Sequence, residues 1–319
     1  MSNCFFEVLR AGINTTFQDK GRFHMQHLGV TPGGCMDLES FSIANALVGN
    51  SSNEGALEFA YQGPLMKLVK GRTQIAITGN VLFQIIKSDQ TIIRGECNRT
   101  YILDEGDQID IMATEKSAYG YMSLVGGFNI KSFCKSVSIL SRAEIGPNEG
   151  KKIKINDKIN INISSKNKKN FLAKVLKKNK NTIRVLEGPQ FNYFSKESQN
   201  IFFSKEFKIS NLTDRMGMRL EGIAMKNIVN TNIRSEGITK GAIQVPADGQ
   251  PIILLTDYPT IGGYPKIANI ISADYNLLVQ KTPSEKIFFK LIKLHEAEQL
   301  YKEHLNSISD IIKNIKEIN

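Results

Sequence analysis

Short runs of apolar residues, alternating with polar ones, dominate the chain and predict strands. Residues 74–79 and 81–86 form two such runs, and residues 91–94 and 101–103 follow them before a turn at residues 104–107. Turn residues recur every few positions, whereas helical spacing is rare. The pattern therefore favours a mainly β protein with barrel architecture and few helices over an alternating α/β sheet.

Two segments carry the spacing of amphipathic helices. The first runs from Asp37, a suitable N-cap residue, to Val48, before Gly49. The second begins at Leu294, and its apolar stripe comprises Ala297, Tyr301, Leu305, Ile308, Ile312 and Ile315. This stripe predicts a C-terminal helix that packs on the body of the protein or on a partner, because about three heptads are short for a free coiled coil.

The excess positive charge is confined to one segment. The chain has a formal net charge of +10, and residues 151–180 hold 11 lysines and one acid, Asp157, which leaves 30 basic and 30 acidic residues elsewhere. Isoleucines at odd positions from Ile153 to Ile163 are separated mostly by Lys or Asn, a period of two that a turn at Asn156-Asp157 breaks, so these lysines are expected on the outer face of strands. The polar residues 164–181 are interpreted as a loop or linker between an N-terminal part, 1–163, and a C-terminal part, 182–319.

Several partners and compartments are not indicated by the sequence. The Lys-rich segment has no Arg and one aromatic residue, Phe171, so it lacks the groups that nucleic-acid sites usually use. No apolar run of about 18 residues and no signal-like start is present, so we expect a cytoplasmic protein that does not bind membranes. The four cysteines and four histidines have no metal-site spacing, and no metal held by this chain is predicted.

Familiar catalytic and carrier motifs are also missing. The chain contains no phosphate-binding loop, serine-hydrolase elbow or dinucleotide fingerprint. The tripeptide Ala224-Met225-Lys226 is similar to a biotin-accepting site, but Asn227 stands where a second Met is usual. No bound biotin is therefore expected on this chain.

Two polar, glycine-dense segments remain as candidates for chemistry. The first covers residues 15–22 and 29–37, and the second covers residues 241–251 and 257–265. Glycine pairs permit close backbone approach, while Arg, Asp and Gln supply fixed donors and acceptors. The alternative for any one of these residues is a tight loop in which the side chain satisfies backbone groups or forms an internal ion pair.

These segments belong to a longer series of motifs in chain order. The series comprises Val8-Leu9-Arg10-Ala11-Gly12, Gln18-Asp19-x-Gly21-Arg22, Pro32-Gly33-Gly34-x-Met36-Asp37, Ala44-Asn45-x-Leu47-Val48-Gly49-Asn50, Ala56-Leu57-Glu58, Val125-Gly126-Gly127, Arg184-Val185-Leu186-x-Gly188-Pro189-Gln190, the run from Asp214 to Gly222, Ser235-Glu236-Gly237, the run from Gln244 to Pro251, and Thr260-x-Gly262-Gly263-Tyr264-Pro265. Together they resemble the family variously called the 5-oxoprolinase C subunit, allophanate hydrolase subunit 2, or the carboxyltransferase-like antagonist of a sporulation-kinase inhibitor. The sequence departs from the family pattern at residues 138–142, at Ser284, at Cys35 and at His24.

The resemblance implies a cyclophilin-like β-barrel in a protein that works with two partners, a homologous B subunit and a larger A subunit of 5-oxoprolinase. The implied reaction is the ATP-dependent hydrolytic opening of the lactam 5-oxoproline to glutamate. ATP, with Mg, is expected at a site shared with one of these partners. Two alternatives stay open: a carboxyltransferase component of a urea carboxylase-like system that depends on biotin, and a non-catalytic binding partner of the B-subunit homologue.

On this hypothesis, four residues are assigned to catalysis and twelve to binding substrate or nucleotide. The catalytic candidates are Arg22, Asp37, Arg215 and Asp257. The binding candidates are Gln18, Asp19, Gly33, Gly34, Arg219, Gln244, Asp248, Gln250, Thr260, Gly262, Gly263 and Tyr264. The arginines are expected to grip carboxylate or phosphate, since a guanidinium can bind such anions in two places. The glutamines are expected to fix an amide or urea-like group through a donor and an acceptor.

Overall fold

The computed structural model describes residues 4–162, 169–176, 180–229 and 232–318. The chain divides into two compact units, and each takes segments from distant parts of the sequence. Unit 1 comprises residues 1–22, 37–176 and 307–319, and unit 2 comprises residues 23–36 and 177–306. The two units are described separately.

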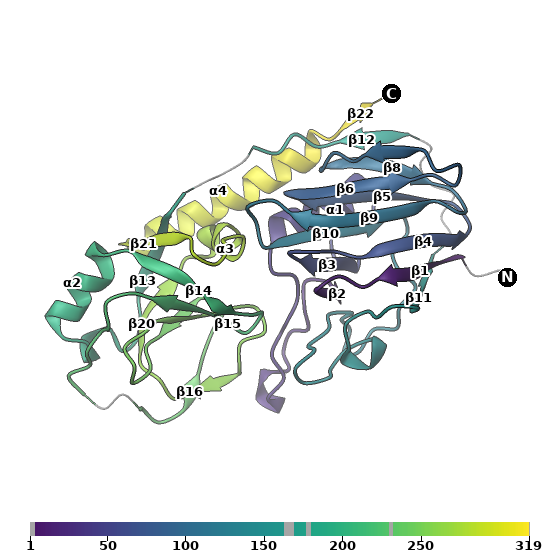
Figure 1. Ribbon diagram of the computed structural model, residues 1–319. Coiled ribbons are helices and arrows are strands. Elements are labelled where there is room, and N and C mark those ends of the chain that lie inside the picture. The colour runs from purple at the N-terminus through teal and green to yellow at the C-terminus, as the bar shows by residue number, and fades with distance from the viewer. Residues whose placement is uncertain (1–3, 163–168, 177–179, 230–231, 319) are drawn as a thin grey trace. The chain divides into compact units, whose positions relative to one another are not determined.

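Unit 1 is built from two antiparallel sheets that lie in stacked layers (Figure 1). One sheet has the order β11-β1-β4-β9-β6-β7, with bounds Lys158–Ile161, Cys4–Arg10, Leu65–Lys70, Gln108–Thr114, Val81–Ile86 and Ile92–Arg94. The other has the order β2-β3-β10-β5-β8-β12-β22, with bounds Asn14–Gln18, Ala56–Ala60, Tyr119–Leu124, Thr73–Gly79, Arg99–Leu103, Asn170–Leu172 and Lys316–Ile318. Alternate residues of both sheets form one core in which Phe6, Phe59 and Phe83 are buried. A short 3-10 helix, η2 (Asn148–Gly150), precedes β11.

Helix α1 (Leu38–Leu47) covers one face of the seven-stranded sheet and packs beside β5 and β10. Its N-cap is Asp37, whose carboxylate accepts hydrogen bonds from the backbone N–H groups of Glu39 and Ser40. These bonds satisfy donors that the first helical turn leaves open. The predicted helix and its cap are therefore confirmed.

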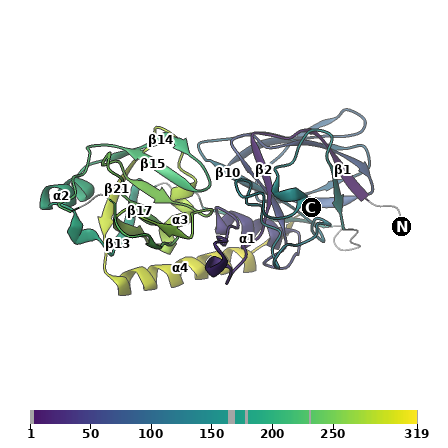
Figure 2. The ribbon, with the colours of Figure 1, turned by 90° about the horizontal axis from the view of Figure 1, so that it is seen from below.

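Unit 2 contains a closed seven-stranded barrel. Its order is β13-β20-β17-β18-β15-β14-β21, with bounds Thr182–Glu187, Lys266–Ile270, Ala242–Gln244, Ile252–Leu254, Gly217–Glu221, Phe207–Thr213 and Lys286–Leu291. Helix α2 (Lys196–Ser204) packs against β21, and α3 (Ser272–Val279) lies beside β13 (Figure 2). The strands β16 (Glu236–Gly237) and β19 (Ile261–Gly262) pair with each other outside the barrel. Unit 2 also includes the 3-10 helices η1 (Gln26–Leu28) and η3 (Phe191–Tyr193).

The predicted C-terminal helix is α4 (Leu294–Lys313). In unit 2 its Ala297 packs with Ile271 and Ile292, and in unit 1 the later residues Ile311 and Ile315 pack against the cluster around α1. Within the apolar stripe Ala297 and Ile308 are buried, whereas Leu294, Tyr301 and Leu305 are exposed, so the stripe is covered only in part. Among the described helices, none is both long enough and apolar enough to cross a membrane.

The mainly β, barrel-containing fold with few helices is confirmed, but three local predictions need correction. Helices α2 and α3 are short and were missed, because neither shows a long apolar stripe. The turn expected at Asn156-Asp157 begins one residue earlier, at residues 155–156, so Ile155 is 60% exposed although it belongs to the odd-numbered isoleucine series. Within the loop predicted over residues 164–181, residues 170–172 form β12, while residues 164–168 and 177–179 lie outside the described part of the chain.

Candidate functional site

The residues predicted to form the site fall into both units. Gln18, Asp19, Arg22 and Asp37 belong to unit 1, and the other twelve belong to unit 2. Within each unit the fold gathers them into separate polar groups, which are described in turn.

Asp19 is the centre of a buried cluster in unit 1, with only 2% of its surface exposed. Its Oδ1 accepts hydrogen bonds from the hydroxyls of Ser136 (2.7 Å) and Ser138 (2.6 Å) and from the N–H of Gly21 (2.8 Å). Its Oδ2 accepts a fourth bond from the N–H of Val137 (2.8 Å). A carboxylate has about four acceptor positions, so this group is fully engaged in holding residues 136–138 against the 19–22 turn.

Arg22 and Gln18 are tied to the same segment. The Arg22 side chain is buried and donates a hydrogen bond to the carbonyl oxygen of Ser138. Gln18, also fully buried, donates from Nε2 to the Thr16 hydroxyl and to the Ile139 carbonyl oxygen, both at 3.0 Å. The first glycine-dense segment is therefore held by hydrogen bonds to the residues around 138, where the sequence departs from the family pattern.

Asp37 contributes to a second chain of hydrogen bonds in unit 1. Besides capping α1, it donates from its backbone N–H to the hydroxyl of Tyr121 (2.7 Å), which donates in turn to the Glu58 carboxylate (2.6 Å). Tyr121 and Glu58 are both buried. The start of α1 is thus fixed to strands β10 and β3, and the contacts found for Asp37 are positional.

In unit 2, Arg215 and Asp257 form a buried, bidentate ion pair. Nε of Arg215 lies 2.8 Å from Oδ2 of Asp257, and its Nη2 lies 2.9 Å from Oδ1. Nη2 also donates to the carbonyl oxygen of Gly34 at 2.6 Å. Gly33 and Gly34 both have positive φ angles, so the ion pair holds a loop in a backbone conformation that favours glycine.

A polar cluster lies where strands β16, β17, β19 and β20 meet, and we call Gln190, Glu236, Gln244 and Lys266 the Lys266 cluster. Lys266 is 4% exposed, and its Nζ lies 2.5 Å from Oε1 of Glu236. The same carboxylate oxygen accepts a hydrogen bond from Nε2 of Gln190 (2.8 Å). The Lys266 ammonium, and then the Gln190 amide, hold the pKa of Glu236 below its ordinary value.

Gln244 completes the Lys266 cluster under the second glycine pair. It is 5% exposed, and within the described residues its Nε2 has no hydrogen-bond partner. A Cβ atom at Gly262 would lie 2.5 Å from this nitrogen, so a side chain at residue 262 would displace the Gln244 amide from its observed position. An amide donor that is buried without an acceptor is costly, and it is suited to a ligand carbonyl.

The remaining predicted residues have more exposed surroundings. Arg219 and Asp248 form an ion pair of 3.0 Å in which both side chains are more than one third exposed. Gln250 exchanges two hydrogen bonds with the backbone of Gly222. Tyr264 is exposed, its carbonyl oxygen lies 3.4 Å from Nζ of Lys266, and the Thr260 carbonyl oxygen accepts from the N–H of Ile238.

The fold therefore unites Gln244, Gly262, Gly263 and Tyr264, and adds three residues to which no role was assigned from the sequence. Gln190 and Glu236 lie inside motifs that carried the resemblance, whereas Lys266 lies directly after one. The available signal for Lys266 was a charged residue at the start of an otherwise apolar strand. The serines 136 and 138 were also missed, because a lone hydroxyl gives no pattern.

Comparisons with known proteins agree on one family. The family model "Carboxyltransferase domain, subdomain A and B" matches residues 28–291. The chain is 32% identical over 305 residues to the 5-oxoprolinase C subunit of Escherichia coli K12, covering 94% of this chain and 97% of that protein. It is 29% identical over 323 residues to "Urea amidolyase" of Lachancea kluyveri, covering 93% of this chain but 17% of that protein.

A solved structure supports the same relationship. The crystal structure of the urea amidolyase from Kluyveromyces lactis matches with a TM-score of 0.87 and 27% identity over 98% of this chain. The chain spans 20% of the length of that protein.

Proposed function

Because the chain belongs to the carboxyltransferase-domain family that includes the C subunit of 5-oxoprolinase, we propose that it is the corresponding component of an ATP-dependent 5-oxoprolinase complex. The observation that carries the proposal is the length of the match. Nearly the whole chain aligns with nearly the whole of the Escherichia coli protein, but it aligns with only a fraction of the Lachancea kluyveri urea amidolyase. It would act with a B-subunit homologue and a larger A subunit, and the hydrolase activity would belong to the complex.

The Lys266 cluster supplies groups that suit a lactam with a carboxylate. The amide N–H of Gln244 would donate to the ring carbonyl oxygen, since this donor lacks an acceptor within the described residues. Lys266 would meet the substrate carboxylate, in exchange for Glu236, which is the more exposed partner of the pair at 43%. Gly262 and Gly263 would allow the flat ring to approach the backbone.

Activation of the lactam explains the requirement for ATP. An amide is a poor electrophile, and phosphorylation of its oxygen converts it into an imidate-like species that water can open. Cations or amide donors placed near the transferred phosphoryl group, where negative charge develops, would stabilise the transfer. In this scheme Gln244 orients the oxygen for phosphorylation, and Lys266 fixes the other end of the substrate.

The described contacts of Arg22, Asp37, Arg215 and Asp257 fit positioning roles. Each holds a loop or a helix start, and the carboxylates of Asp37 and Asp257 already accept hydrogen bonds from this chain. These two engaged carboxylates therefore fit a magnesium ligand set poorly. We propose that the ATP site is shared with a partner protein of the complex.

The test is co-expression with the A and B subunits, followed by ATP-turnover assays with 5-oxoproline, with urea and with neither. We expect turnover that depends on 5-oxoproline, lowered at least about 30-fold by Gln244→Leu, which removes one transition-state donor. Gln299→Leu, at an exposed position on α4, is the matched control and should retain full turnover. A rate of ATP turnover that is the same with and without 5-oxoproline would contradict the proposal.

A carboxyltransferase role is the second candidate, favoured by the fold match to the urea amidolyase of Kluyveromyces lactis. A planar urea offers the same donor and acceptor pattern as a lactam, so the Lys266 cluster alone does not separate the two. In this case turnover would require urea, a biotin carboxylase and a biotinylated carrier supplied by other chains. An inactive pair that co-purifies with the B-subunit homologue would instead indicate a non-catalytic binding role.

A further inference from the structure

Unit 1 contains a cavity of about 300 Å³ at the start of strand β11, outside the Asp19 cluster. Its lining comes from Phe17 on β2, from residues 129–131, from residues 147–148, from Ile153, and from residues 157–160 at the start of β11. The volume is at the lower end of the range of small-molecule sites in proteins. All of these residues belong to one compact unit, so the cavity is complete within unit 1.

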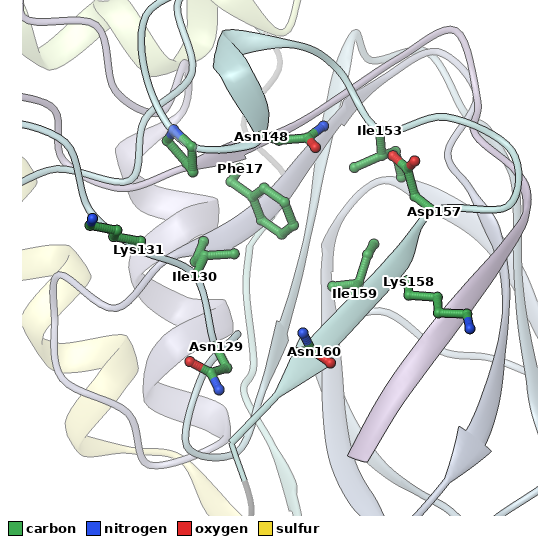
Figure 3. A pocket seen from close by; sticks show the side chains of 11 residues that line it. Phe17, Asn129, Ile130, Lys131, Asn148, Ile153, Asp157, Lys158, Ile159 and Asn160 are labelled. Atoms are coloured by element: carbon green, nitrogen blue, oxygen red, sulfur yellow. The ribbon is translucent and has the colours of Figure 1, made fainter. Parts of the chain in front are cut away.

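The floor of the cavity is apolar. Figure 3 shows the Phe17 ring between Ile130 on one side and Ile153 and Ile159 on the other. Phe17, Ile153 and Ile159 are part of the core of unit 1 and are at most 5% exposed, while Ile130 is half-buried. A flat or branched apolar group can rest on these side chains without disturbing the core.

The walls are held by backbone hydrogen bonds. The N–H of Ile153 donates to the Thr15 carbonyl oxygen (3.1 Å), and the N–H of Asn129 donates to the Asn160 carbonyl oxygen (2.9 Å). The Asn148 side chain donates to the carbonyl oxygen of Lys151 (3.1 Å) and so closes the 147–151 turn. The cavity is therefore preformed, which reduces the ordering cost of binding.

The rim is polar and positively charged. Asn129 and Asn160 lie on one side of the floor, the exposed Lys131 lies beyond Ile130 with its ammonium group directed away from Phe17, and Lys158 lies on the opposite side (Figure 3). The lining holds two lysines, Lys131 and Lys158, and one acid, Asp157, while Lys151, Lys152, Lys154 and Glu149 lie nearby in the sequence. Both acids are engaged: Asp157 accepts the N–H of Lys154 (2.7 Å), and Glu149 pairs with Lys151 (2.7 Å).

We propose that this cavity binds a small organic anion with an apolar body, such as an aromatic or branched carboxylate. The apolar body would rest on Phe17 and the isoleucines, and the carboxylate would be met by the amides of Asn129 and Asn160 and by Lys131, whose exposed side chain would turn toward it. The proposal does not depend on the reaction of the Lys266 cluster.

The experiment uses the full chain with ¹³C-labelled isoleucine methyl groups, titrated with benzoate and separately with benzyl alcohol. We expect benzoate to shift the methyl signals of Ile130, Ile153 and Ile159 with a dissociation constant on the order of 1 mM, as for a weak small-molecule contact. Benzyl alcohol should bind at least about 10-fold more weakly, because it lacks the charge that Lys131 meets.

Two variants and one control sharpen the titration. Lys131→Ala should weaken benzoate binding about fivefold, and Ile130→Trp should abolish it by filling the cavity, whereas Lys302→Ala on α4 should change nothing. The spectrum of each variant reports whether it is folded. The proposal is overturned if benzoate leaves these three methyl signals unmoved, if the alcohol binds equally well, or if Lys131→Ala binds as the unmodified chain does.

Discussion

The Asp19 cluster of unit 1 and the Lys266 cluster of unit 2 both bury a charged side chain, but they satisfy it differently. Asp19 receives four hydrogen bonds from its own chain, which uses its acceptor capacity. Lys266 pairs with a carboxylate that is 43% exposed, beside a buried Gln244 amide whose Nε2 has no partner within the described residues. The first arrangement stabilises a fold, whereas the second leaves hydrogen-bonding capacity for a ligand.

The largest effect that this comparison predicts is on stability in unit 1. Asp19→Ala leaves two hydroxyls and two backbone N–H groups without their acceptor, so we expect the free energy of unfolding to fall by about 3 kcal/mol or more. Urea unfolding followed by circular dichroism measures this loss. Asp248→Ala, at an exposed ion pair, is the matched control and should cost less than about 0.5 kcal/mol. Equal losses for the two variants would refute the structural role of Asp19.

The next effect is on activity in unit 2. Lys266→Met keeps the length of the side chain but removes the cation proposed to meet the substrate, so lactam-dependent ATP turnover in the complex should fall about 100-fold, or about 2.7 kcal/mol. Lys281→Met is the control, because Lys281 is also buried and also paired with a carboxylate, that of Glu285 at 2.9 Å.

The control variant should lose stability while retaining turnover. If Lys281→Met abolishes turnover as completely as Lys266→Met does, the proposal that Lys266 binds the substrate carboxylate is wrong. Size-exclusion profiles of both variants with the A and B subunits separate lost assembly from lost chemistry.

A smaller effect concerns pH. Since the pKa of Glu236 lies below the ordinary value of 4.5, the charged form stabilises the folded state. This contribution is fully present above pH 4.5 and is lost as the pH falls through the lowered pKa. The difference in unfolding free energy between the unmodified chain and Glu236→Gln should therefore be constant at neutral pH and shrink below about pH 4.5. A difference that grows on acidification would show that the Lys266 pairing does not stabilise the carboxylate.

The smallest effect is expected at Arg219. Its ion pair with Asp248 is exposed, so Arg219→Ala should change the free energy of unfolding by less than about 0.5 kcal/mol. If Arg219 contacts substrate or nucleotide, as the resemblance implies, KM should rise about threefold or more while stability is unchanged. Steady-state kinetics of the complex, at fixed ATP and then at fixed 5-oxoproline, measure the change. An unchanged KM for both would remove Arg219 from the site.

Local structure was predicted well where a few adjacent residues decide it. Asp37 caps α1 because its carboxylate meets two N–H groups within three residues. The strands over residues 73–79 and 81–86 follow their apolar runs. The turn expected at Asn156-Asp157 begins one residue earlier, so Ile155 is exposed although it continues the alternation.

The candidate site was predicted only in part, for a reason of distance along the chain. Gln244 and Gly262 were identified from glycine-dense segments, but their neighbours Gln190, Glu236 and Lys266 were not. Gln190 and Lys266 are 76 residues apart and meet because the barrel pairs β13, which ends at Glu187 shortly before Gln190, with β20, which begins at Lys266. Likewise, Ser138 bonds to Asp19 across 119 residues, and no local pattern marks it.

The sequence by itself determined the family, the mainly β character, the capped helix α1 and the amphipathic C-terminal helix, because these depend on motifs and on periodicity over a few turns. Only the tertiary structure decided which buried charged group has its hydrogen-bonding positions filled by this chain and which lies beside a donor that can bind a ligand. Asp19 lies inside a family motif and Lys266 lies directly after one, but the number of donors and acceptors around each is set by segments far away in the sequence. Burial decides how much this number matters. A polar group without a protein partner costs little free energy where water can bind it, but costs much more inside the protein.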